Sequence, residues 1–385
     1  MKVALIRKKY SPFGGAERYV DTLVRHLLDL GHEVHIFANE WESATRGTQS
    51  ATQRLVFHRV PMIKGLSVLK LLSFAINVRR LLKKERFEIV HSFERTLYQD
   101  IARAGDGCHK EWLIQRAKYE PFWKRVLVGI NPLHWSFLWI EKQIFDKKNT
   151  QIVIANSQRG KEEIIRHYGF PAERIRVIYN GVDTKRFNPA CRGKFRKAVR
   201  DFLGLSEDIR VLLFLGSGFE RKGLKFAIES LSKINEPKIK LVVAGKDNPK
   251  RYRMQARRLG VVDKVIFYGP TKEPERLYGA ADVFVLPTIY EPFSNACLEA
   301  IASGVPVVTS KINGFSEFIE DGVTGVCVED PSDIEALKGA IQRLLRQDNR
   351  ETIKWAKTKG RLIDVENHVR ETVKCYEAVL AGMLK

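Results

Sequence analysis

The chain alternates short apolar runs with amphipathic helix patterns almost from end to end. Strands that alternate with helices predict parallel sheets, because a crossover helix must return the chain to the starting edge of the sheet. A first set of strands is expected at residues 3–6, 33–38, 56–60, 88–91, 152–155 and 175–179. A second set is expected at residues 211–215, 240–244, 265–268, 283–286 and 306–309. Helices are expected at 16–30, at 69–82, between 91 and 104, and from about residue 331 onward.

The pattern is interrupted once, at residues 180–208. Asn180-Gly181, Asn188-Pro189 and a basic run at 192–200 indicate a linker there. At 385 residues the chain is long enough for two domains with ordinary cores. We therefore predict an α/β protein with two doubly wound, Rossmann-like domains that face a central cleft. The expected boundaries are a first domain at 1–180, a second at 181–365 and a final helix, packed back on the first domain, at 366–385.

The charge of the chain is extreme, with 66 Lys and Arg against 45 Asp and Glu, a net charge of +21. Such a charge predicts attraction to nucleic acid, an anionic membrane or an acidic substrate. The five cysteines are dispersed, with no Cys-x-x-Cys pair and no His/Cys spacing of the zinc-site type, so reduced thiols in cytosol are expected. Neither a signal peptide nor a run of about 18 apolar residues that would span a membrane is expected.

Two acids frame the segment that follows the predicted strand at 283–286. Glu291 falls in the loop after this strand, and Glu299 about two turns into the next predicted helix. Ligands of open α/β sheets bind at this edge, and the unpaired N–H groups of a first helical turn suit a phosphate. The segment can therefore hold the sugar, pyrophosphate and ribose of a nucleotide sugar. The alternative is an ordinary surface loop acid followed by a solvated helix acid.

Several short motifs occur in a fixed order along the chain. They are Gly14-Gly15, Asn180 to Asp183, Arg221-Lys222-Gly223, the pair Glu291 and Glu299, and Gly314 to Gly325. In this set and order the chain resembles the retaining, two-domain glycosyltransferases of GT-B fold and family 4 type, also described as glycosyl transferases group 1. That large family includes sucrose synthases and bacterial mannosyl- and glucosyltransferases. The resemblance implies a retaining hexosyltransferase.

The family resemblance also implies roles for the acids and the cations. Glu291 would bind hydroxyls of the donor sugar and Glu299 the ribose, while Arg221 and Lys222 stabilise charge on the leaving diphosphate. Retention would follow from front-face attack, with the leaving phosphate taking the acceptor proton. No metal or other cofactor is expected, since the sequence contains no Asp-x-Asp pair to bind a divalent ion. The residues expected to contact the nucleotide sugar are Gly14, Gly15, Gly216, Arg221, Lys222, Tyr268, Glu291, Phe293, Ser294, Asn295, Ala296 and Glu299.

A narrower resemblance rests on Lys9 to Gly15, Gly216 to Gly223 and Ala244 to Pro249. These segments are similar to bacterial lipopolysaccharide core glucosyltransferases, which add glucose to a heptose. The implied donor is UDP-glucose, the implied acceptor a lipid-anchored glycan, and the implied location the cytoplasm, peripherally on the inner face of the plasma membrane. Alternatives are a transferase for another bacterial surface glycan with a different donor, a sugar-nucleotide epimerase, and a basic nucleic-acid binding protein. The last lacks a recognisable recognition motif, so no nucleic-acid partner is expected.

Asp106 and His109 form a further candidate pair. They are expected in a glycine-containing loop after the strand and helix of residues 88–104. A histidine titrates near neutral pH, so a catalytic or acceptor-binding role is one interpretation. A structural histidine is the other.

Residues 110–142 hold four of the six tryptophans, interleaved with basic side chains. Tryptophan with Lys and Arg is typical of a membrane interface. Pro121 and Pro132 exclude one long helix. Shallow docking on an anionic leaflet is the preferred interpretation, and packing of the tryptophans into the first domain's core is the alternative. The residues expected at the membrane are Trp123, Lys124, Arg125, Trp135 and Trp139.

Overall fold

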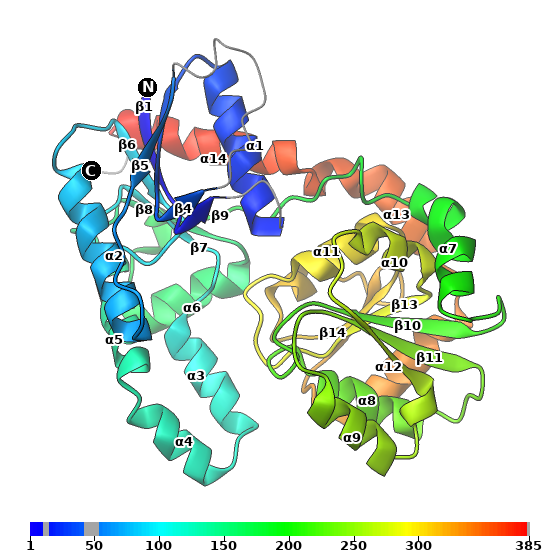
Figure 1. Ribbon diagram of the computed structural model, residues 1–385. Helices are drawn as coiled ribbons and strands as arrows, with labels where there is room; N and C mark the ends of the chain where they lie inside the picture. The colour runs from blue at the N-terminus through cyan, green and yellow to red at the C-terminus, as the bar shows by residue number, and fades with distance from the viewer. Residues whose placement is uncertain (11–14, 42–53, 383–385) are drawn as a thin grey trace. The chain divides into compact units, whose positions relative to one another are not determined.

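The computed structural model describes residues 1–10, 15–41 and 54–382 (Figure 1). The chain divides into a first unit, Met1–Gly181 with Val365–Lys385, and a second unit, Val182–Asp364. Each unit is an α/β body built on a parallel sheet, which confirms the prediction of two Rossmann-like domains. None of the helices in the described residues combines the length and the apolarity that a membrane span requires.

The first unit contains a seven-stranded parallel sheet in the order β5-β3-β1-β6-β7-β8-β9. Its strands are β1 (Lys2–Ile6), β3 (Glu33–Ala38), β5 (Leu55–Arg59), β6 (Ile89–Ser92), β7 (Ile101–Ala104), β8 (Ile152–Ala155) and β9 (Ile175–Val177). Its helices are α1 (Gly15–Asp29), α2 (Ser67–Leu82), α3 (His109–Lys118), α4 (Phe122–Gly129), α5 (Pro132–Ile144), α6 (Gln158–Tyr168) and α14 (Val365–Leu380). The strands β2 (Lys9–Tyr10) and β4 (Glu40–Trp41) form a separate short ladder, and η1 (Ala172–Arg174) precedes β9.

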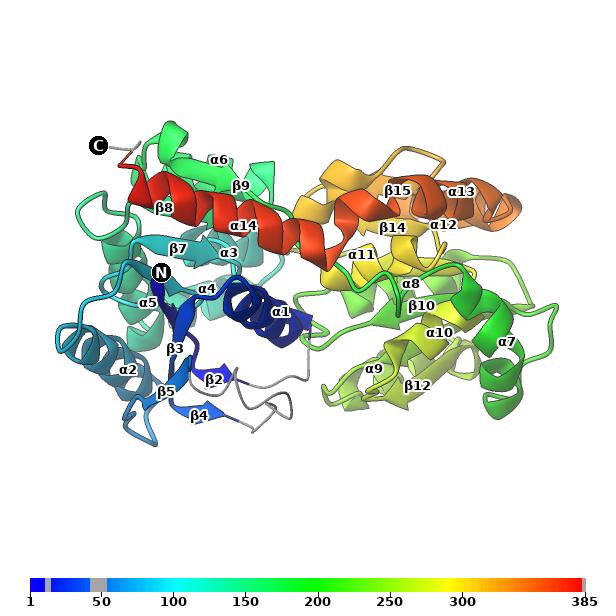
Figure 2. The same cartoon turned by 90° about the horizontal axis from the view of Figure 1, so that it is seen from above.

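Alternate side chains of each strand enter cores on opposite faces of this sheet, as the period of two requires. Val3 and Leu5 pack with apolar residues of α1 and α14, whereas Ala4 and Ile6 pack with α2. Helices α1 and α14 therefore cover one face together, and they lie side by side in both Figure 1 and Figure 2. The last helix thus belongs to the first unit although it follows the whole second unit in sequence.

The second unit contains a six-stranded parallel sheet in the order β12-β11-β10-β13-β14-β15. Its strands are β10 (Arg210–Leu215), β11 (Ile239–Ala244), β12 (Val265–Gly269), β13 (Val283–Leu286), β14 (Val307–Ser310) and β15 (Gly325–Val328). Its helices are α7 (Ala190–Phe202), α8 (Leu224–Lys233), α9 (Lys250–Arg258), α10 (Pro274–Ala280), α11 (Asn295–Ala302), α12 (Ile334–Arg346) and α13 (Arg350–Lys359). Short 3-10 turns are η2 (Val262–Lys264), η3 (Gly314–Phe318) and η4 (Gly360–Ile363).

The expected linker at residues 180–208 is wrong over residues 190–202, where α7 forms and packs against α10. The basic run is one face of this helix. Arg192, Arg196 and Arg200, spaced four residues apart, all reach the buried carboxylate of Asp282, at 3.2, 3.1 and 2.8 Å. Side chains four apart share a helix face. The run therefore attaches a helix to the sheet instead of marking a loop.

Two strands of the main sheets were not predicted, nor was the short β2-β4 ladder. The structure forms β7 where a helix was expected, and it adds β15 to the sheet of the second unit. In β7 the guanidinium of Arg103 stacks on the Tyr19 ring, with Cζ 4.7 Å from the ring centroid, and its Nη2 donates to Asn180 Oδ1 at 2.6 Å. A half-buried arginine in the middle of the strand interrupts the apolar run that usually signals an inner strand.

Candidate functional site

The carboxyl ends of β10 and β13, which are neighbours in the sheet, carry two loops that are tied together. The loop after β10 leads to Gly223, and the loop after β13 begins at Pro287. The Arg221 carbonyl accepts from the Ile289 N–H and from the Thr288 hydroxyl, both at 2.9 Å. Gly223 has φ +76°, and a Cβ there would lie 1.8 Å from the Pro287 carbonyl oxygen. This close approach requires glycine.

The carboxylate of Glu291 lies between two cations at this junction. Its Oε2 accepts from Arg221 Nη1 at 2.6 Å and lies 3.2 Å from Lys222 Nζ. The side chain of Glu291 is only 12% exposed. Burial acts to raise the pKa of this carboxyl, but the charges of Lys222 and Arg221 outweigh it, so the pKa lies below its ordinary value. The site therefore presents an ionised acceptor beside two fixed cations.

Gly216 was predicted to contact the donor, and the structure gives it a further role. It has φ +138°, and a Cβ at this position would lie 2.7 Å from Lys222 Cε. The absence of a side chain at Gly216 thus leaves the space in which the lysine stem lies. Lys222 itself is buried, so its ammonium is held in one place before any phosphate arrives.

The helix α11 begins directly after this loop. Ser294 caps it, with the hydroxyl accepting from the Cys297 N–H at 3.2 Å. The helix end points its dipole at the same edge of the sheet, and Ser294 satisfies one of the terminal amides from within the chain. Asn295 and Ala296 form the first turn, as predicted.

Glu299 is the fifth residue of α11, one to two turns from its start. Burial raises the pKa of its carboxyl to about 7, although Tyr278, which donates to it at 3.1 Å, acts in the opposite direction. Near neutral pH this side chain is therefore present in both protonation states. Tyr278 orients the carboxyl of Glu299, and the same hydroxyl also contacts the Ala296 carbonyl oxygen at 2.9 Å.

The pKa of Glu299 predicts pH-dependent nucleotide binding if the ionised carboxylate accepts from the ribose. Affinity for UDP should rise by about tenfold between pH 6 and pH 8, because the ionised fraction rises by that factor around a pKa of 7. Binding should also release a proton, which calorimetry in buffers of different ionisation enthalpy measures.

The matched control is Glu299→Gln, which keeps the shape and does not titrate. The phosphate ionisation of UDP is common to both proteins, so the difference between them isolates Glu299. An equal pH dependence in the two proteins would remove Glu299 from the ribose role. The effect of pH on folding stability has the opposite sign to its effect on UDP affinity. Because the pKa of Glu299 in the folded state is raised above 4.5, its contribution to folding stability falls as pH rises through 7.

Other predicted donor contacts have different surroundings. Phe293 is buried, with ring edges against Phe315 and Phe318 at centroid distances of 5.8 Å, so any ligand contact there falls to its backbone. Tyr268 lies on the edge strand β12 and packs against Phe202 of α7 at 6.3 Å. Contacts of Phe293 and Tyr268 with the donor stay predictions, because both rings pack against other aromatic side chains. Gly15 begins α1 in the first unit, and Gly14 lies outside the described residues.

Two side chains that position the site were not found from the sequence. Thr288 joins the two loops, and Tyr278 orients Glu299. A signal for Thr288 was available, because it lies two residues after the end of β13. Tyr278 lies on α10, a different helix, and no spacing connects it with Glu299.

Asp106 and His109 are not brought together as a pair. Residues 105–108 form the expected loop, but the loop follows the strand β7 instead of a helix, and His109 is the first residue of α3. Asp106 is exposed and lies 3.3 Å from Arg95, whereas His109 Nε2 lies 2.9 Å from His134 Nδ1. Burial, and then Arg95, lower the pKa of His109 to about 3. A neutral, internally paired imidazole does not suit proton transfer near pH 7.

Residues 110–142 form three helices, separated at Pro121 and Pro132, which confirms the predicted breaks. Trp123, Trp135 and Trp139 are 59%, 65% and 49% exposed, so the alternative of core packing is wrong for these three. Trp112 is half-buried. Further exposed apolar side chains on the same segment are Ile114, Phe122, Val126, Leu127 and Ile130.

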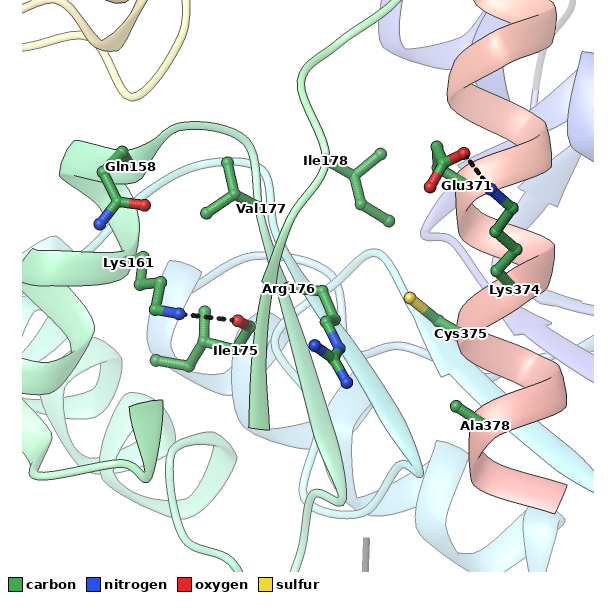
Figure 3. Close-up of a pocket in the computed structure, with 10 residues that line it drawn as sticks. All are labelled: Gln158, Lys161, Ile175, Arg176, Val177, Ile178, Glu371, Lys374, Cys375 and Ala378. Carbon is green, nitrogen blue, oxygen red and sulfur yellow. Dashed lines mark hydrogen bonds and ion pairs between the residues drawn. The ribbon is translucent and has the colours of Figure 1, made fainter. Parts of the chain in front are cut away.

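The first unit also has a cavity of about 560 Å³ at the open edge of its sheet, between α6, β9 and α14 (Figure 3). Its lining includes Lys161, Arg176 and Lys374 against one acid, Glu371. Lys161 Nζ donates to the Ile175 carbonyl at 3.2 Å, and Lys374 pairs with Glu371 at 2.7 Å. None of the residues predicted from the sequence lines this cavity.

Both halves of the chain match families of known glycosyltransferases. A family described as Glycosyltransferase Family 4 matches residues 13–186, and one described as Glycosyl transferases group 1 matches residues 195–360. The chain is 24% identical over 386 residues to lipopolysaccharide glucosyltransferase WaaG of Escherichia coli K12, covering 100% of both chains. It is 28% identical over 430 residues to D-inositol 3-phosphate glycosyltransferase 2 of Catenulispora acidiphila, covering 99% of this chain and 98% of that one.

Solved structures share the fold. The crystal structure of WaaG, a glycosyltransferase involved in lipopolysaccharide biosynthesis, has a TM-score of 0.79 at 24% identity and covers 95% of this chain and 98% of that one. Anabaena HepE in complex with UDP and glucose has a TM-score of 0.70 at 18% identity, covering 98% of this chain and 100% of that one. These likenesses show the GT-B fold.

Proposed function

Because the chain is a glycosyltransferase with a family 4 domain and a group 1 domain, we propose that it transfers glucose from UDP-glucose to the heptose of a lipid-linked lipopolysaccharide core. The observation that carries the chemistry is the ionised Glu291 held between Arg221 and Lys222 at the carboxyl edge of β10 and β13. Full-length similarity to WaaG, a lipopolysaccharide glucosyltransferase, supports glucose as the transferred sugar and lipopolysaccharide as the acceptor.

Each of these residues has a separate role in the proposed reaction. Charge grows on the diphosphate as the sugar departs, and Arg221 and Lys222 stabilise it with donors that need no rearrangement. Glu291 accepts from sugar hydroxyls and orients the ring. Attack occurs on the face that the diphosphate leaves, so the anomeric configuration is retained, and a phosphate oxygen takes the acceptor proton.

A second acceptor class follows from a different observation. D-inositol 3-phosphate glycosyltransferases match this chain over nearly its full length. Inositol 3-phosphate is therefore the second candidate acceptor.

Product analysis separates these functions. The protein is incubated with a panel of nucleotide sugars and with either truncated lipopolysaccharide ending in heptose or inositol 3-phosphate, and products are measured by mass. Glucose added only to the heptose supports the proposal. Transfer only to inositol phosphate supports the second candidate. An isomerised donor without transfer would indicate an epimerase and contradict both.

The balance of charge at the site predicts activity without a divalent ion. Arg221, Lys222 and the start of α11 would neutralise the diphosphate, so turnover should persist within about twofold in excess EDTA. The measurement compares initial rates in EDTA and in Mg²⁺ or Mn²⁺. Complete loss in EDTA, restored by either ion, would show that a metal carries part of the phosphate charge.

We further propose that the exposed face of α4 and α5 docks on the anionic inner leaflet, where the acceptor is anchored. Trp123, Trp135 and Trp139 supply exposed aromatic area, and Lys124 and Arg125 lie among them. Each basic residue near an anionic surface contributes about 1 kcal/mol. Binding to anionic liposomes is therefore expected at low salt and should fade as salt shortens the Debye length to about 8 Å.

Sedimentation with liposomes tests this docking, with uncharged liposomes as the lipid control. The variant Trp135→Ala/Trp139→Ala should bind at least several-fold more weakly than the wild type. A wild type that ignores anionic liposomes at low salt would end the idea. Equal binding by the variant and the wild type would mean that the basic residues alone dock the protein and that Trp135 and Trp139 do not contribute.

A further inference from the structure

A cluster of histidine and carboxylate side chains lies on the face of the first unit's sheet that α2 covers. His35 is on β3, His58 on the neighbouring edge strand β5, and Glu85 in the segment between α2 and β6. The register pairs His58 with Phe37, so His35 and His58 point to the same face. One ligand atom from each of the three side chains falls within 4.8 Å of the others.

Hydrogen bonds within the cluster orient the imidazole of His35. His35 Nδ1 lies 2.7 Å from His58 Nε2 and 3.8 Å from a Glu85 carboxylate oxygen. The other nitrogen of His35, Nε2, lies 2.7 Å from Glu33 Oε1. A carboxylate on the far nitrogen of an imidazole holds the proton there and leaves the near nitrogen as a ligand, as in histidines that bind metals.

Packing holds the rings in place. The imidazole of His35 is buried, with the edge of Phe87 against it at a centroid distance of 5.1 Å. His58 is stacked on Phe37 at 4.4 Å with an interplanar angle of 7°. Ligands that packing has already ordered lose little conformational entropy on binding an ion.

We propose that His35 Nδ1, His58 Nε2 and Glu85 bind a zinc ion. Two imidazoles and one carboxylate, with a water in the fourth position, are a donor set that zinc uses. With Zn–N bonds of about 2.0–2.1 Å and a tetrahedral angle, the two nitrogens must stand about 3.3 Å apart. Binding therefore opens the present contact between the rings by about 0.6 Å through small rotations of the two side chains. The proton in that contact moves from His58 Nε2 to His58 Nδ1, so that both ligand nitrogens offer a lone pair.

The charges of the cluster favour a cation. Glu33 and Glu85 bring two negative charges. Among the described residues, Lys2 is the one ammonium in contact with them, through Glu85 and at 3.7 Å from Glu33. With both imidazoles neutral, these residues carry a net charge of −1. Lys2 competes for Glu85, and its side chain, 28% exposed, can swing into solvent when zinc binds.

The placement indicates a structural role. The three ligands join β3, the edge strand β5 and the segment after α2, so an ion here would fasten one edge of the first sheet. They lie in the first unit, whereas Glu291 and its two cations lie in the second. The zinc site is therefore independent of the proposed transferase chemistry, and activity in EDTA does not test it.

The experiment uses full-length, untagged protein, stripped with EDTA and dialysed. Zinc titration against a chromophoric chelator should show one equivalent bound with micromolar or tighter affinity. Cobalt should give the visible absorption of a tetrahedral site. The melting temperature should rise with zinc.

Three variants give opposing expectations. His58→Gln and Glu85→Gln should each weaken zinc at least ~10-fold, while Lys2→Met, which removes the competing ammonium, should tighten it. His26→Ala, a histidine of the same unit outside the cluster, should change nothing. No saturable zinc uptake by the wild type, or equal uptake by His58→Gln and Glu85→Gln, would overturn the proposal and leave a hydrogen-bonded histidine pair with an ordinary ion pair.

Discussion

Replacing Lys222 by alanine should lower turnover by at least ~100-fold, because one preorganised donor to a developing phosphate charge is worth that much. The buried position of the lysine, 3.2 Å from Glu291, strengthens this expectation, since a cation held in place needs no reorganisation. The measurement is kcat with saturating UDP-glucose and with each other donor. A variant with near-normal turnover on every donor would show that the cation pair is misassigned.

Stability needs a separate measurement for this variant. A solvated lysine contributes little to folding, but Lys222 is buried and shares a carboxylate with Arg221, so its loss should also lower the melting temperature. Assays belong well below that temperature. Lys233→Ala, at the exposed end of α8, removes the same charge from the same unit and should keep full activity.

Replacing Glu291 by glutamine should cut turnover by about 100-fold while strengthening the binding of free UDP. The amide keeps the size of the side chain but loses the charge that accepts strongly from sugar hydroxyls. It also stops neutralising Arg221 and Lys222, so the two cations attract a diphosphate more strongly. Kinetics and calorimetry on one protein preparation give both values.

The two effects have opposite signs, so a general loss of folding cannot imitate them. Glu317→Gln, an exposed acid on η3, is the matched control and should change neither quantity. Unchanged turnover in Glu291→Gln would place the sugar contact elsewhere. Weaker UDP binding would mean that Glu291 touches the nucleotide instead of restraining the cations.

The strands around the candidate site could be located from the sequence because their signals are local. The run at 283–286 is apolar without a break, and β13 has these same limits. Arg221, Lys222 and Gly223 lie in the loop between the first strand of their unit and the next helix, so the chain itself places them at the carboxyl edge. Adjacent strands in a parallel sheet bring such loops together, and this is why Glu291 meets the two cations.

Other assignments depended on partners far away in the sequence. The basic run at 192–200 becomes a helix face because Asp282 lies across from it, more than 80 residues later. His109 is unsuited to proton transfer because burial and Arg95 depress its pKa. Nothing in the residues next to them carries this information.

The sequence by itself determined the alternation of strands and helices, the two sheets and the loop that holds Glu291. Hydrophobic periodicity and the order of elements along the chain are local signals, carried by residues that are neighbours in sequence. Only the tertiary structure decided which polar groups are buried, which are paired and which face solvent. It exposed Trp123, Trp135 and Trp139, buried Lys222, and brought the ligand atoms of His35, His58 and Glu85 within 4.8 Å of one another. The physical reason is that the pKa, charge and accessibility of a side chain are set by what packs against it, and those neighbours come from distant parts of the chain.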